Sequence, residues 1–520
     1  MRETQILQPP MKRIILLILF VAGSNLRAAD WPMWGHDASR NMQIFETGLP
    51  ADFHPGTMDY ETEKIDMATT RNIKWIAKMG SQTYGNVTVA GGRIFVGTNN
   101  ESPRDPKHKG DRGIVMCLDE ATGAFRWQLV VPKLGAGKVS DWEYLGICSS
   151  PLADGNRVYV ISNRCAVVCL DADGLANGND GPFKDEGKYM SAAGQPPVTP
   201  GPTDADIIWL YDMREELGIF PHNITSSSVL MVGERLYVTT SNGQDWSHVN
   251  IPNPRAPCLI VLDKNTGELR GEEAAGISTR LFHCNWSSPA SGAGGGQDYV
   301  FFGAGDGFCY AFDPQPVAGT DDLATLKEYW RFDCNPPEYK VKDGKPVKYA
   351  SSGIGPSEII ATPVYYEGHV YVATGQDPEH GQGVGSLSCI DVTKRGDISR
   401  TGARWRYKDL HRSIGTIAAR DGLVYAADFT GRLHCIDAKT GKAYWVHDTI
   451  SNIWASPLVV DGKVYIGNED GIMTVVAAGK TKKILATPEF PAPIYSSAIA
   501  ANGVLYVSTH THLYAIAKPK

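Results

Sequence analysis

The sequence predicts an all-β fold, an eight-bladed β-propeller of four-stranded antiparallel blades that is closed by an N-terminal outer strand. Two observations predict this fold. A unit of short strands recurs eight times along the chain, and an isolated strand precedes the first complete unit. Because one such unit cannot bury both of its faces, the units must pack side by side in an array.

Residues 421–445 show the repeated unit most clearly. Two short runs rich in strand formers, 423–427 and 432–436, flank a turn, and a second turn at 437–441 leads into a strand carrying Trp445. In the second turn, Asp437 is placed to accept backbone N–H bonds and Gly441 tolerates the positive φ that closes the turn. The pattern Asp-x-x-Thr-Gly-x-x-x-Trp recurs at 119–127, and its first half recurs at 263–267.

A second pattern is an aromatic-containing strand upstream of the turn. It occurs at 93–96, 157–160, 235–238, 300–302, 369–372, 423–425, 463–466 and 504–507. Small residues precede most of these strands, at 149–151, 226–228, 287–289, 361–363, 455–457 and 496–498, and we predict that they form the inner strands. Small residues suit a strand that crowds the axis of a propeller.

The two ends of the repeat array are complementary. Residues 72–79 carry an isolated strand with Trp75, and the last unit, 494–517, is one strand short. We therefore expect 74–78 to complete the eighth blade beside 513–517, because this pairing removes two exposed sheet edges. The predicted propeller domain spans 72–518.

The repeated turn, with Cys-Leu/Ile-Asp before it, resembles the pyrroloquinoline-quinone-type propeller repeat from about residue 73 to 518. That superfamily includes quinoprotein alcohol dehydrogenases, the outer-membrane assembly lipoprotein and exported proteins of unassigned role. The resemblance implies the fold but does not establish an activity.

The dehydrogenases of this superfamily place the quinone over the axis, between a Trp and a ring of two adjacent cysteines, with Ca²⁺ held by Glu and Asn. This chain has no adjacent cysteines. Trp286 or Trp454 would be the candidate floor, and Glu143 with Asn223 or Asn285 the candidate Ca²⁺ ligands. No local motif matches, so the resemblance transfers none of these roles.

The N-terminus has the composition of an export signal. A basic start at 11–13, an apolar run at 14–22 and small residues at 28–29 predict a signal peptide over 1–29, with 1–10 interpreted as an upstream start. Because the apolar run is too short to cross a bilayer, we expect an exported, soluble protein, periplasmic or secreted, without stable membrane insertion. Residues 30–71 are expected to form an extended lead-in over one propeller face, anchored by Trp31 and Trp34.

Composition narrows the expected partners and cofactors. The net charge of -7, with no long run of Lys and Arg, argues against nucleic acid. The absence of Cys-x-x-Cys-His indicates that no covalently attached haem is encoded.

Ten cysteines in an exported protein suggest disulfides. Four of them, Cys117, Cys169, Cys389 and Cys435, hold one equivalent position in different blades and are expected to be buried thiols too far apart to pair. The other six leave room for one bridge, with its pairing open.

An insertion at 171–207 contains a loop rich in Asp, Asn and Gly. Its candidate Ca²⁺ ligands are Asp171, Asp173, Asn177, Asn179 and Asp180. Calcium takes about six to eight oxygen ligands, which such a loop can supply. A solvated turn cluster is the alternative, because Leu175 occupies a ligand position of an EF-hand and no Glu follows at the twelfth.

The segments that enter the inner strands should line one mouth of the central channel. Their candidate ligand-binding residues are Tyr84, Trp142, Glu143, His222, Asn223, His283, Asn285, Trp286, Glu358, His411, Arg412, Asn452, Trp454 and Tyr495. Counting back from the strands aligns Tyr84, Cys148, Ser226, Trp286, Ile360, Ile414, Trp454 and Tyr495. Aromatic faces hold planar groups and His/Glu pairs move protons, although Asn and His at such junctions also satisfy backbone groups.

Three functions remain open from the sequence. The leading hypothesis is an exported binding or scaffold protein with a protein or glycan partner. The second is a periplasmic dehydrogenase that uses pyrroloquinoline quinone (PQQ) and calcium to oxidise an alcohol or sugar. The third is a hydrolase or lyase that uses His and Glu of the channel mouth. Enzymatic character, substrate and oligomeric state stay undetermined at this level.

Overall fold

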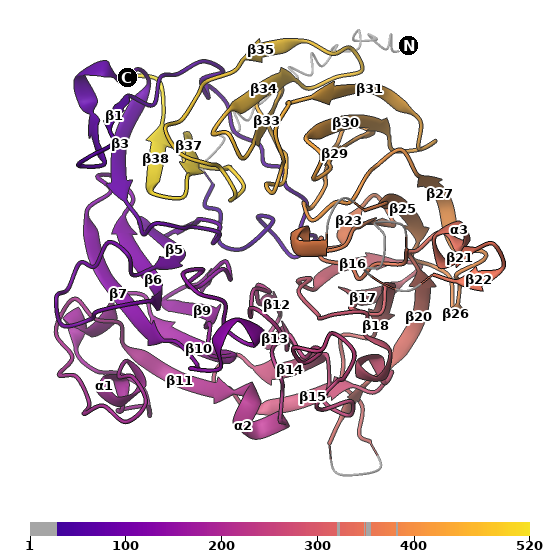
Figure 1. Cartoon of the computed structure of the whole chain (residues 1–520), viewed down its shortest axis with the longest axis horizontal. Coiled ribbons are helices and arrows are strands. Elements are labelled where there is room, and N and C mark those ends of the chain that lie inside the picture. The colour runs from indigo at the N-terminus through magenta and orange to yellow at the C-terminus, as the bar shows by residue number, and fades with distance from the viewer. Residues whose placement is uncertain (1–28, 320–322, 348, 350–354, 381–382, 520) are drawn as a thin grey trace, which may run out of the picture.

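A computed structural model describes residues 29–319, 323–347, 349, 355–380 and 383–519; residues 1–28 of the predicted signal peptide, 1–29, lie outside them. The described residues form eight blades around a central axis, and Figure 1 shows that the blades follow chain order around the ring. The predicted eight-bladed all-β propeller is therefore confirmed.

Each blade is an antiparallel sheet of four strands, which follow one another from the axis outward. Blades one to four are β4 (Thr88–Ala90), β5 (Arg93–Asn99), β6 (Arg112–Asp119), β7 (Phe125–Pro132); β8 (Leu152–Asp154), β9 (Arg157–Ile161), β10 (Ala166–Asp171), β11 (Ile207–Asp212); β12 (Leu230–Val232), β13 (Arg235–Thr239), β14 (Leu259–Asp263), β15 (Leu269–Glu273); and β16 (Ala290–Gly294), β17 (Gln297–Gly303), β18 (Phe308–Phe312), β20 (Glu328–Asp333). Blades five to eight are β23 (Val364–Tyr366), β24 (His369–Thr374), β25 (Ser386–Asp391), β27 (Ala403–Tyr407); β28 (Ala418–Arg420), β29 (Leu423–Ala427), β30 (Arg432–Asp437), β31 (Ala443–Asp448); β32 (Leu458–Val460), β33 (Lys463–Gly467), β34 (Met473–Ala477), β35 (Ile484–Ala486); and β36 (Ile499–Ala501), β37 (Val504–Ser508), β38 (His512–Ile516), β3 (Ile73–Lys78).

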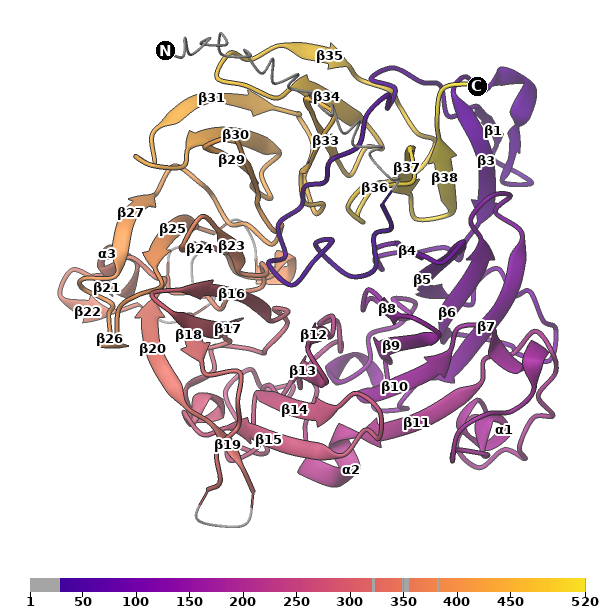
Figure 2. The ribbon, with the colours of Figure 1, turned by 180° about the vertical axis from the view of Figure 1, so that it is seen from behind.

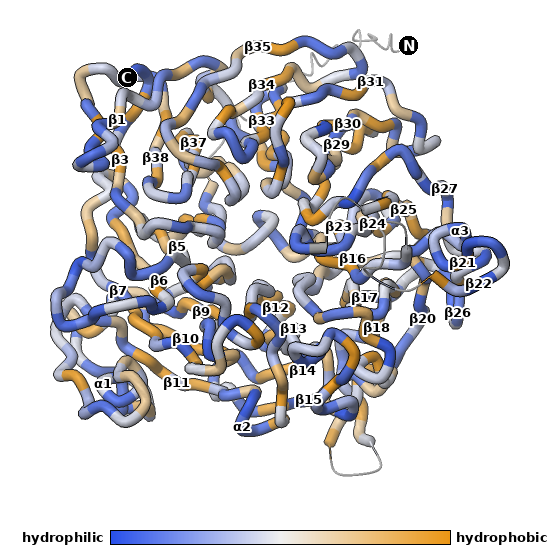
Figure 3. The backbone as a smooth tube through the Cα atoms, in the orientation of Figure 1, coloured by the Kyte–Doolittle hydropathy of each residue, from blue (hydrophilic) through white to orange (hydrophobic). Residues whose placement is uncertain are grey.

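Short elements decorate this ring. Two strands add parallel edges to blades three and four, β19 (Thr325–Leu326) and β26 (Gly396–Asp397), and two hairpins form from β1 (Thr57–Asp59) with β2 (Lys64–Asp66) and β21 (Val341–Lys342) with β22 (Lys345–Pro346). The helices are α1 (Glu186–Tyr189), α2 (Met213–Leu217) and α3 (Pro337–Lys340), with 3-10 turns η1 (Met67–Thr69), η2 (Gly137–Val139), η3 (Gly174–Asn177), η4 (Ile277–Arg280) and η5 (Pro378–His380). Within the described residues, no helix is long and apolar enough to cross a membrane. In Figure 3, apolar colour follows the blade strands and polar colour gathers at outer loops such as β21–β22.

The eighth blade combines both ends of the repeat array. Its outer strand is β3, which pairs antiparallel with β38 from Ile73 opposite Ile516 to Lys78 opposite His512. The first strand of the repeat array thus pairs with the last strand of the chain inside blade eight, and this pairing closes the ring.

The repeated Trp links one blade to the turn of the next. Trp127 donates its indole N–H to the Ala172 carbonyl at 2.9 Å, and Trp405 donates to the Ala438 carbonyl at 2.9 Å. The ring of Trp405 also lies against Gly441, where a Cβ would meet ring carbon at 2.6 Å. Equivalent indole bonds are made by Trp75, Trp209, Trp330 and Trp445. The pattern Asp-x-x-Thr-Gly-x-x-x-Trp therefore encodes packing between blades.

The small-residue tripeptides lie just before the inner strands, so the prediction that they form those strands is wrong by about one tripeptide. Strand β8, for example, begins at Leu152, after Ser149–Pro151. The tripeptides instead bond to one another around the axis, backbone N–H to hydroxyl oxygen. Such bonds join Ser150 to Ser228, Ser228 to Ser288, Thr362 to Thr416, Thr416 to Ser456 and Ser456 to Ser497. Small hydroxyl side chains are needed at these positions because neighbouring backbones approach closely.

The lead-in closes one face of the ring. Figure 2 shows this indigo segment crossing the centre. Trp31 exchanges two backbone bonds of 2.9 Å with Val89 of blade one, Asn41 bonds both backbone groups of Ala419 in blade six, and Met42 accepts from Val459 in blade seven. The segment thus pairs with the inner strands of blades one, six and seven.

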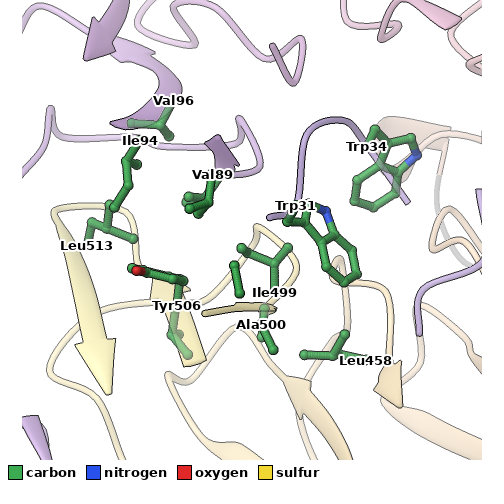
Figure 4. Close-up of a cluster of buried hydrophobic side chains, with 14 of the residues drawn as sticks. Trp31, Trp34, Val89, Ile94, Val96, Leu458, Ile499, Ala500, Tyr506 and Leu513 are labelled. Carbon is green, nitrogen blue, oxygen red and sulfur yellow. The ribbon is translucent and has the colours of Figure 1, made fainter. Parts of the chain in front are cut away.

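Two tryptophans anchor the lead-in. Trp31 is 0% exposed and Trp34 is 7% exposed, and both belong to the largest apolar cluster among the described residues. Figure 4 shows the Trp31 ring among Val89, Ile499 and Leu458, with Trp34 farther along the segment. The indole N–H of Trp34 donates to the Thr362 hydroxyl at 3.0 Å.

Arg40 lies in the lead-in, and its side chain is fully buried. Its guanidinium donates to the carbonyls of Trp34 at 2.7 Å, Val229 at 2.8 Å and Pro289 at 2.8 Å. Burial lowers the pKa of Arg40 to about 9, an effect that the Asp37 carboxylate opposes. The side chain therefore remains a cation at neutral pH and links the lead-in to blades three and four.

Candidate functional site

The central channel opens into a cavity of about 390 Å³. Six aromatic residues contribute to its lining: Trp34, Tyr84, Trp142, Trp286, Trp454 and Tyr495. Trp34 comes from the lead-in, and the others come from segments that lead into inner strands. The lead-in therefore blocks the channel from one face, and the cavity occupies the other end.

The eight residues aligned from the repeat register all line this cavity. Tyr84, Trp286, Trp454 and Tyr495 supply rings, whereas Cys148, Ser226, Ile360 and Ile414 supply smaller side chains. The equivalent position in each blade faces the axis because the inner strands are arranged symmetrically around it. Aromatic residues in blades one, four, seven and eight make the lining asymmetric.

The aromatic wall is most ordered at blades seven and eight. Trp454 and Tyr495 stack with ring centroids 4.7 Å apart and planes 9° from parallel. Tyr84 meets Tyr495 edge-on at 5.3 Å, and the Tyr495 hydroxyl donates to Glu469 at 2.5 Å. Edge-on and stacked pairs hold the rings in fixed orientations, leaving a preformed apolar surface.

The polar side chains that line the cavity are either acidic or uncharged. Asp377 and Glu379 supply carboxylates, and Gln82, Asn86 and Asn223 supply amides. None of the described residues that line the cavity is Lys or Arg. The cavity therefore combines aromatic faces with hydrogen-bond acceptors and amide donors, and its fixed side-chain charge is negative.

A buried polar network lies behind the wall formed by Trp286 and Asp377. The Nε2 atoms of His222 and His283 are 2.6 Å apart, and Nδ1 of His283 is 3.1 Å from Oδ2 of Asp377. Tyr349 donates to Glu358 at 2.9 Å, and Arg412 donates to the Asp377 carbonyl at 3.0 Å. The indole of Trp286 lies 4.9 Å from the His283 ring, so the network is directly connected to the cavity wall.

Burial governs protonation in this network. It lowers the pKa of His222 to about 3, with a further contribution from His283. Burial also raises the pKa of Glu358, reinforced by the nearby Asp377 carboxylate. At neutral pH, His222 is therefore neutral and the two carboxyl groups carry less than two full charges.

The predicted channel-mouth residues separate into three groups. Tyr84, Trp142, Asn223, Trp286, Trp454 and Tyr495 line the cavity, and His222, His283, Glu358 and Arg412 form the network behind it. The remaining four residues have other surroundings. Glu143 is exposed beside Lys138, Asn285 bonds the backbone of Asn242 and Gly305, His411 is exposed beside Arg432, and Asn452 donates to Glu469.

The side chains of the candidate calcium loop contact several different partners. Asp173 pairs with Arg93, Asn179 donates to Glu186, and the backbone N–H of Asp180 donates to Asp206. Asp171 accepts from the backbone N–H of Asp173 at 2.8 Å, and Asn177 lies 3.5 Å from the same carboxylate. These contacts match the turn-cluster alternative, and the calcium assignment stays a prediction.

All ten cysteines lie in the described residues and are free thiols. The four at the equivalent blade position are buried, as expected, and burial raises the pKa of Cys117 and Cys169 to about 12. The bridge allowed for among the other six is absent from these ten residues.

Four important residues were not among the predicted binding residues. Trp34 was expected only to anchor the lead-in, and Asp377 lies in the loop that follows the second strand of blade five. Tyr349 and His248 lie in long loops whose sequence shows no strand register. The sequence feature that could have identified Asp377 is its position after the second strand of a blade, where loops reach the channel mouth.

These features define a propeller whose central channel is closed on one face and holds an aromatic, acidic cavity at the other end. The chain belongs to the family described as outer membrane protein assembly factor BamB, which it matches over residues 63–314 and 261–518. It is thus a PQQ-type propeller protein.

Two relatives with assigned activities match parts of the chain. It is 30% identical over 131 residues to 1-butanol dehydrogenase (cytochrome c) of Thauera butanivorans, covering 21% of this chain and 16% of that protein. It is 32% identical over 143 residues to quinohemoprotein alcohol dehydrogenase ADH IIB of Pseudomonas putida, covering 23% and 18%. The matches thus span less than a fifth of the length of these relatives.

Solved structures share the fold at low identity. BamB from Moraxella catarrhalis has a TM-score of 0.51 at 14% identity, covering 85% of this chain and 98% of that one. A europium-containing methanol dehydrogenase has a TM-score of 0.52 at 12% identity, covering 94% and 98%. Quinohemoprotein alcohol dehydrogenase ADHIIG of Pseudomonas putida HK5 has a TM-score of 0.55 at 11% identity, covering 95% and 82%. At these identities the likeness shows the fold alone.

The cavity is a poor match for PQQ. Its aromatic faces suit a planar ring, but PQQ is a tricarboxylate and the described lining offers Asp377 and Glu379 without a Lys or Arg. Bringing carboxylates together in a partly enclosed cavity is unfavourable without a compensating cation. The residues present therefore do not fit the quinone, and they support no redox step through it.

Proposed function

We propose that the protein is an exported, non-catalytic binding protein that holds a sugar unit of a glycan partner in the central cavity. The observation that carries this proposal is that the Trp454–Tyr495 stack shares a cavity with the carboxylates of Asp377 and Glu379. The volume of about 390 Å³ is within the usual range for small-ligand sites, about 300–1,000 Å³.

A sugar suits each part of this lining. The C–H face of a pyranose packs on an aromatic ring, and its hydroxyls donate to carboxylates and accept from amides. Asn86 and Asn223 are amides in the cavity, and Asp377 is held in place through Arg412. Because the wall is preformed, less entropy is lost when a ligand binds.

Glycan-array screening followed by calorimetry tests this function. Trp454→Ala and Tyr495→Ala should each weaken the best ligand by about 2 kcal/mol, or about 30-fold, as expected for a central aromatic anchor. Tyr60→Ala is the control, because Tyr60 is 75% exposed and lies outside the cavity. Equal affinities for Tyr495→Ala and Tyr60→Ala would contradict binding in the cavity, and capture of a protein without any glycan would favour a protein partner.

The second candidate is the quinone-dependent dehydrogenase, which the partial matches to quinoprotein alcohol dehydrogenases support. Titration of calcium-loaded protein with PQQ tests it. Saturable binding that is lost in Trp286→Ala or Trp454→Ala would favour the dehydrogenase over the glycan-binding protein. The acidic lining predicts no such binding.

A further inference from the structure

Three histidines from two blades meet beside the central cavity. His222 precedes the inner strand of blade three, His248 lies in the loop after its second strand, and His283 precedes the inner strand of blade four. One ligand atom from each lies within 4.8 Å of the others, and the ring centroids are 4.3–5.1 Å apart. We call these three residues the histidine cluster.

The contacts of His222 fix its tautomer. Its Nδ1 is 2.5 Å from the carbonyl oxygen of Gln244, and a carbonyl can only accept a hydrogen bond. Nδ1 must therefore carry the proton. In the neutral ring, Nε2 then presents a lone pair, and this atom points at His283.

His283 has the same arrangement. Its Nδ1 lies 3.1 Å from a carboxylate oxygen of Asp377, which favours a proton on Nδ1 and a lone pair on Nε2. The two Nε2 atoms are 2.6 Å apart. Two lone pairs at this distance repel each other unless a cation lies between the rings.

We propose that the histidine cluster binds one divalent transition-metal ion, of which zinc is the best match, through Nε2 of His222, Nε2 of His283 and a ring nitrogen of His248. Imidazole is a preferred ligand of zinc, and histidines that bind metals usually donate their other ring N–H to a carbonyl or carboxylate. Gln244 and Asp377 supply those two acceptors.

The proposed ion has three protein ligands and one further coordination position. Zinc–nitrogen bonds of about 2.0–2.1 Å in a tetrahedron place two nitrogens about 3.3 Å apart, so one ring must move outward slightly on binding. His248 is exposed and can adjust, whereas His222 and His283 are fully buried. The fourth position is filled by water or by a donor atom of a ligand.

The proposed metal site is connected to the cavity through two residues. Asp377 both contacts His283 and lines the cavity, and Trp286 packs on His283 while forming part of the wall. Metal binding would therefore orient one side of the cavity. This proposal does not depend on the sugar ligand, because metal binding is measured without one.

Calorimetry and cobalt spectroscopy test the proposal on the full chain after treatment with a chelator. We expect one Zn²⁺ per chain, and Co²⁺ should give the intense visible bands of a four-coordinate ion. His248→Ala should reduce Zn²⁺ affinity by at least about 100-fold, because loss of a ligand should cost more than loss of an outer partner. Asp377→Asn should reduce it by about 10-fold.

His369→Ala is the matched control, because His369 lies at the start of β24, away from the cluster, and its ring bonds to the Glu367 carbonyl. It should bind zinc like the wild type. His248 lies on an exposed loop, so its replacement is not expected to unfold the protein, and circular dichroism checks this. Absence of Zn²⁺ binding, unchanged affinity in His248→Ala, or a six-coordinate Co²⁺ spectrum would overturn the proposal and leave a proton shared between His222 and His283.

Discussion

Replacing Arg40 should destabilise the whole propeller, although the residue lies outside the repeats. Its three guanidinium bonds of 2.7–2.8 Å reach one carbonyl of the lead-in and one each in blades three and four. Arg40→Ala would leave these carbonyls facing a buried space. A hydrogen bond to a charged group is worth about 1.5–3 kcal/mol, and removing one partner of a buried ionic interaction costs about 3–5 kcal/mol.

We therefore expect Arg40→Ala to lower the free energy of unfolding by about 4 kcal/mol, a large share of the usual 5–15 kcal/mol of a folded domain. The gain from the bonds is partly offset by the cost of burying the cation, which is also what lowers the pKa of Arg40. Arg40→Lys should lie between wild type and Arg40→Ala, because one ammonium group cannot reproduce the planar fork.

Urea unfolding followed by tryptophan fluorescence measures this change. Arg71→Ala serves as the control, because Arg71 belongs to the same lead-in but has a side chain that is 59% exposed and pairs with the surface carboxylate of Asp52. Such a pair contributes about 0–1 kcal/mol. If Arg40→Ala and Arg71→Ala shifted the unfolding midpoint equally, the buried bonds of Arg40 would not stabilise the propeller.

Two further changes test the packing and the protonation of the blades. Gly441→Ala should cost about 3 kcal/mol, because φ is +72° and the new Cβ would lie 2.6 Å from the Trp405 ring, whereas Gly422→Ala, with φ +72° and open space, should cost about 1 kcal/mol. Similar melting temperatures for the two variants would contradict the proposed docking of Trp405. The pKa of His512 is lowered to about 4, first by burial and then by the charge of Lys78, so the folded state keeps this ring neutral. The associated stability should be complete above about pH 6.5 and decline as pH falls toward 4, by about 2 kcal/mol at about pH 5. Urea unfolding at about pH 7 and about pH 5 should show a smaller difference for His512→Gln than for wild type; an unchanged difference would assign the acid sensitivity to other groups.

Much of the candidate site was predictable from the repeat. Tyr84, Trp286, Trp454 and Tyr495 occupy one register position, and a repeated unit around an axis directs that position inward in every blade. Counting residues back from each second strand was therefore enough to find most of the aromatic wall. The same register identified Cys117 and its equivalents as buried thiols.

Local contacts that do not follow from the repeat register were harder to predict. The small tripeptides were expected to be strands, but hydrogen bonding between blades takes up their N–H groups and hydroxyls just before the strands begin. The loop at 171–180 has the composition of a calcium site, and its carboxylates contact Arg93 and Asn156; the calcium assignment stays a prediction. Composition states which groups are present, but it does not state which partners they meet.

The sequence by itself determined the eight blades and the ring of residues that face the axis, because both follow from a periodic pattern acting over short distances. Only the tertiary structure decided that Trp34 reaches the cavity, that Arg40 fills the opposite mouth and that His222, His248 and His283 converge. These residues are separated by long stretches of chain, and their contacts exist only after the ring has closed and its loops have packed against one another.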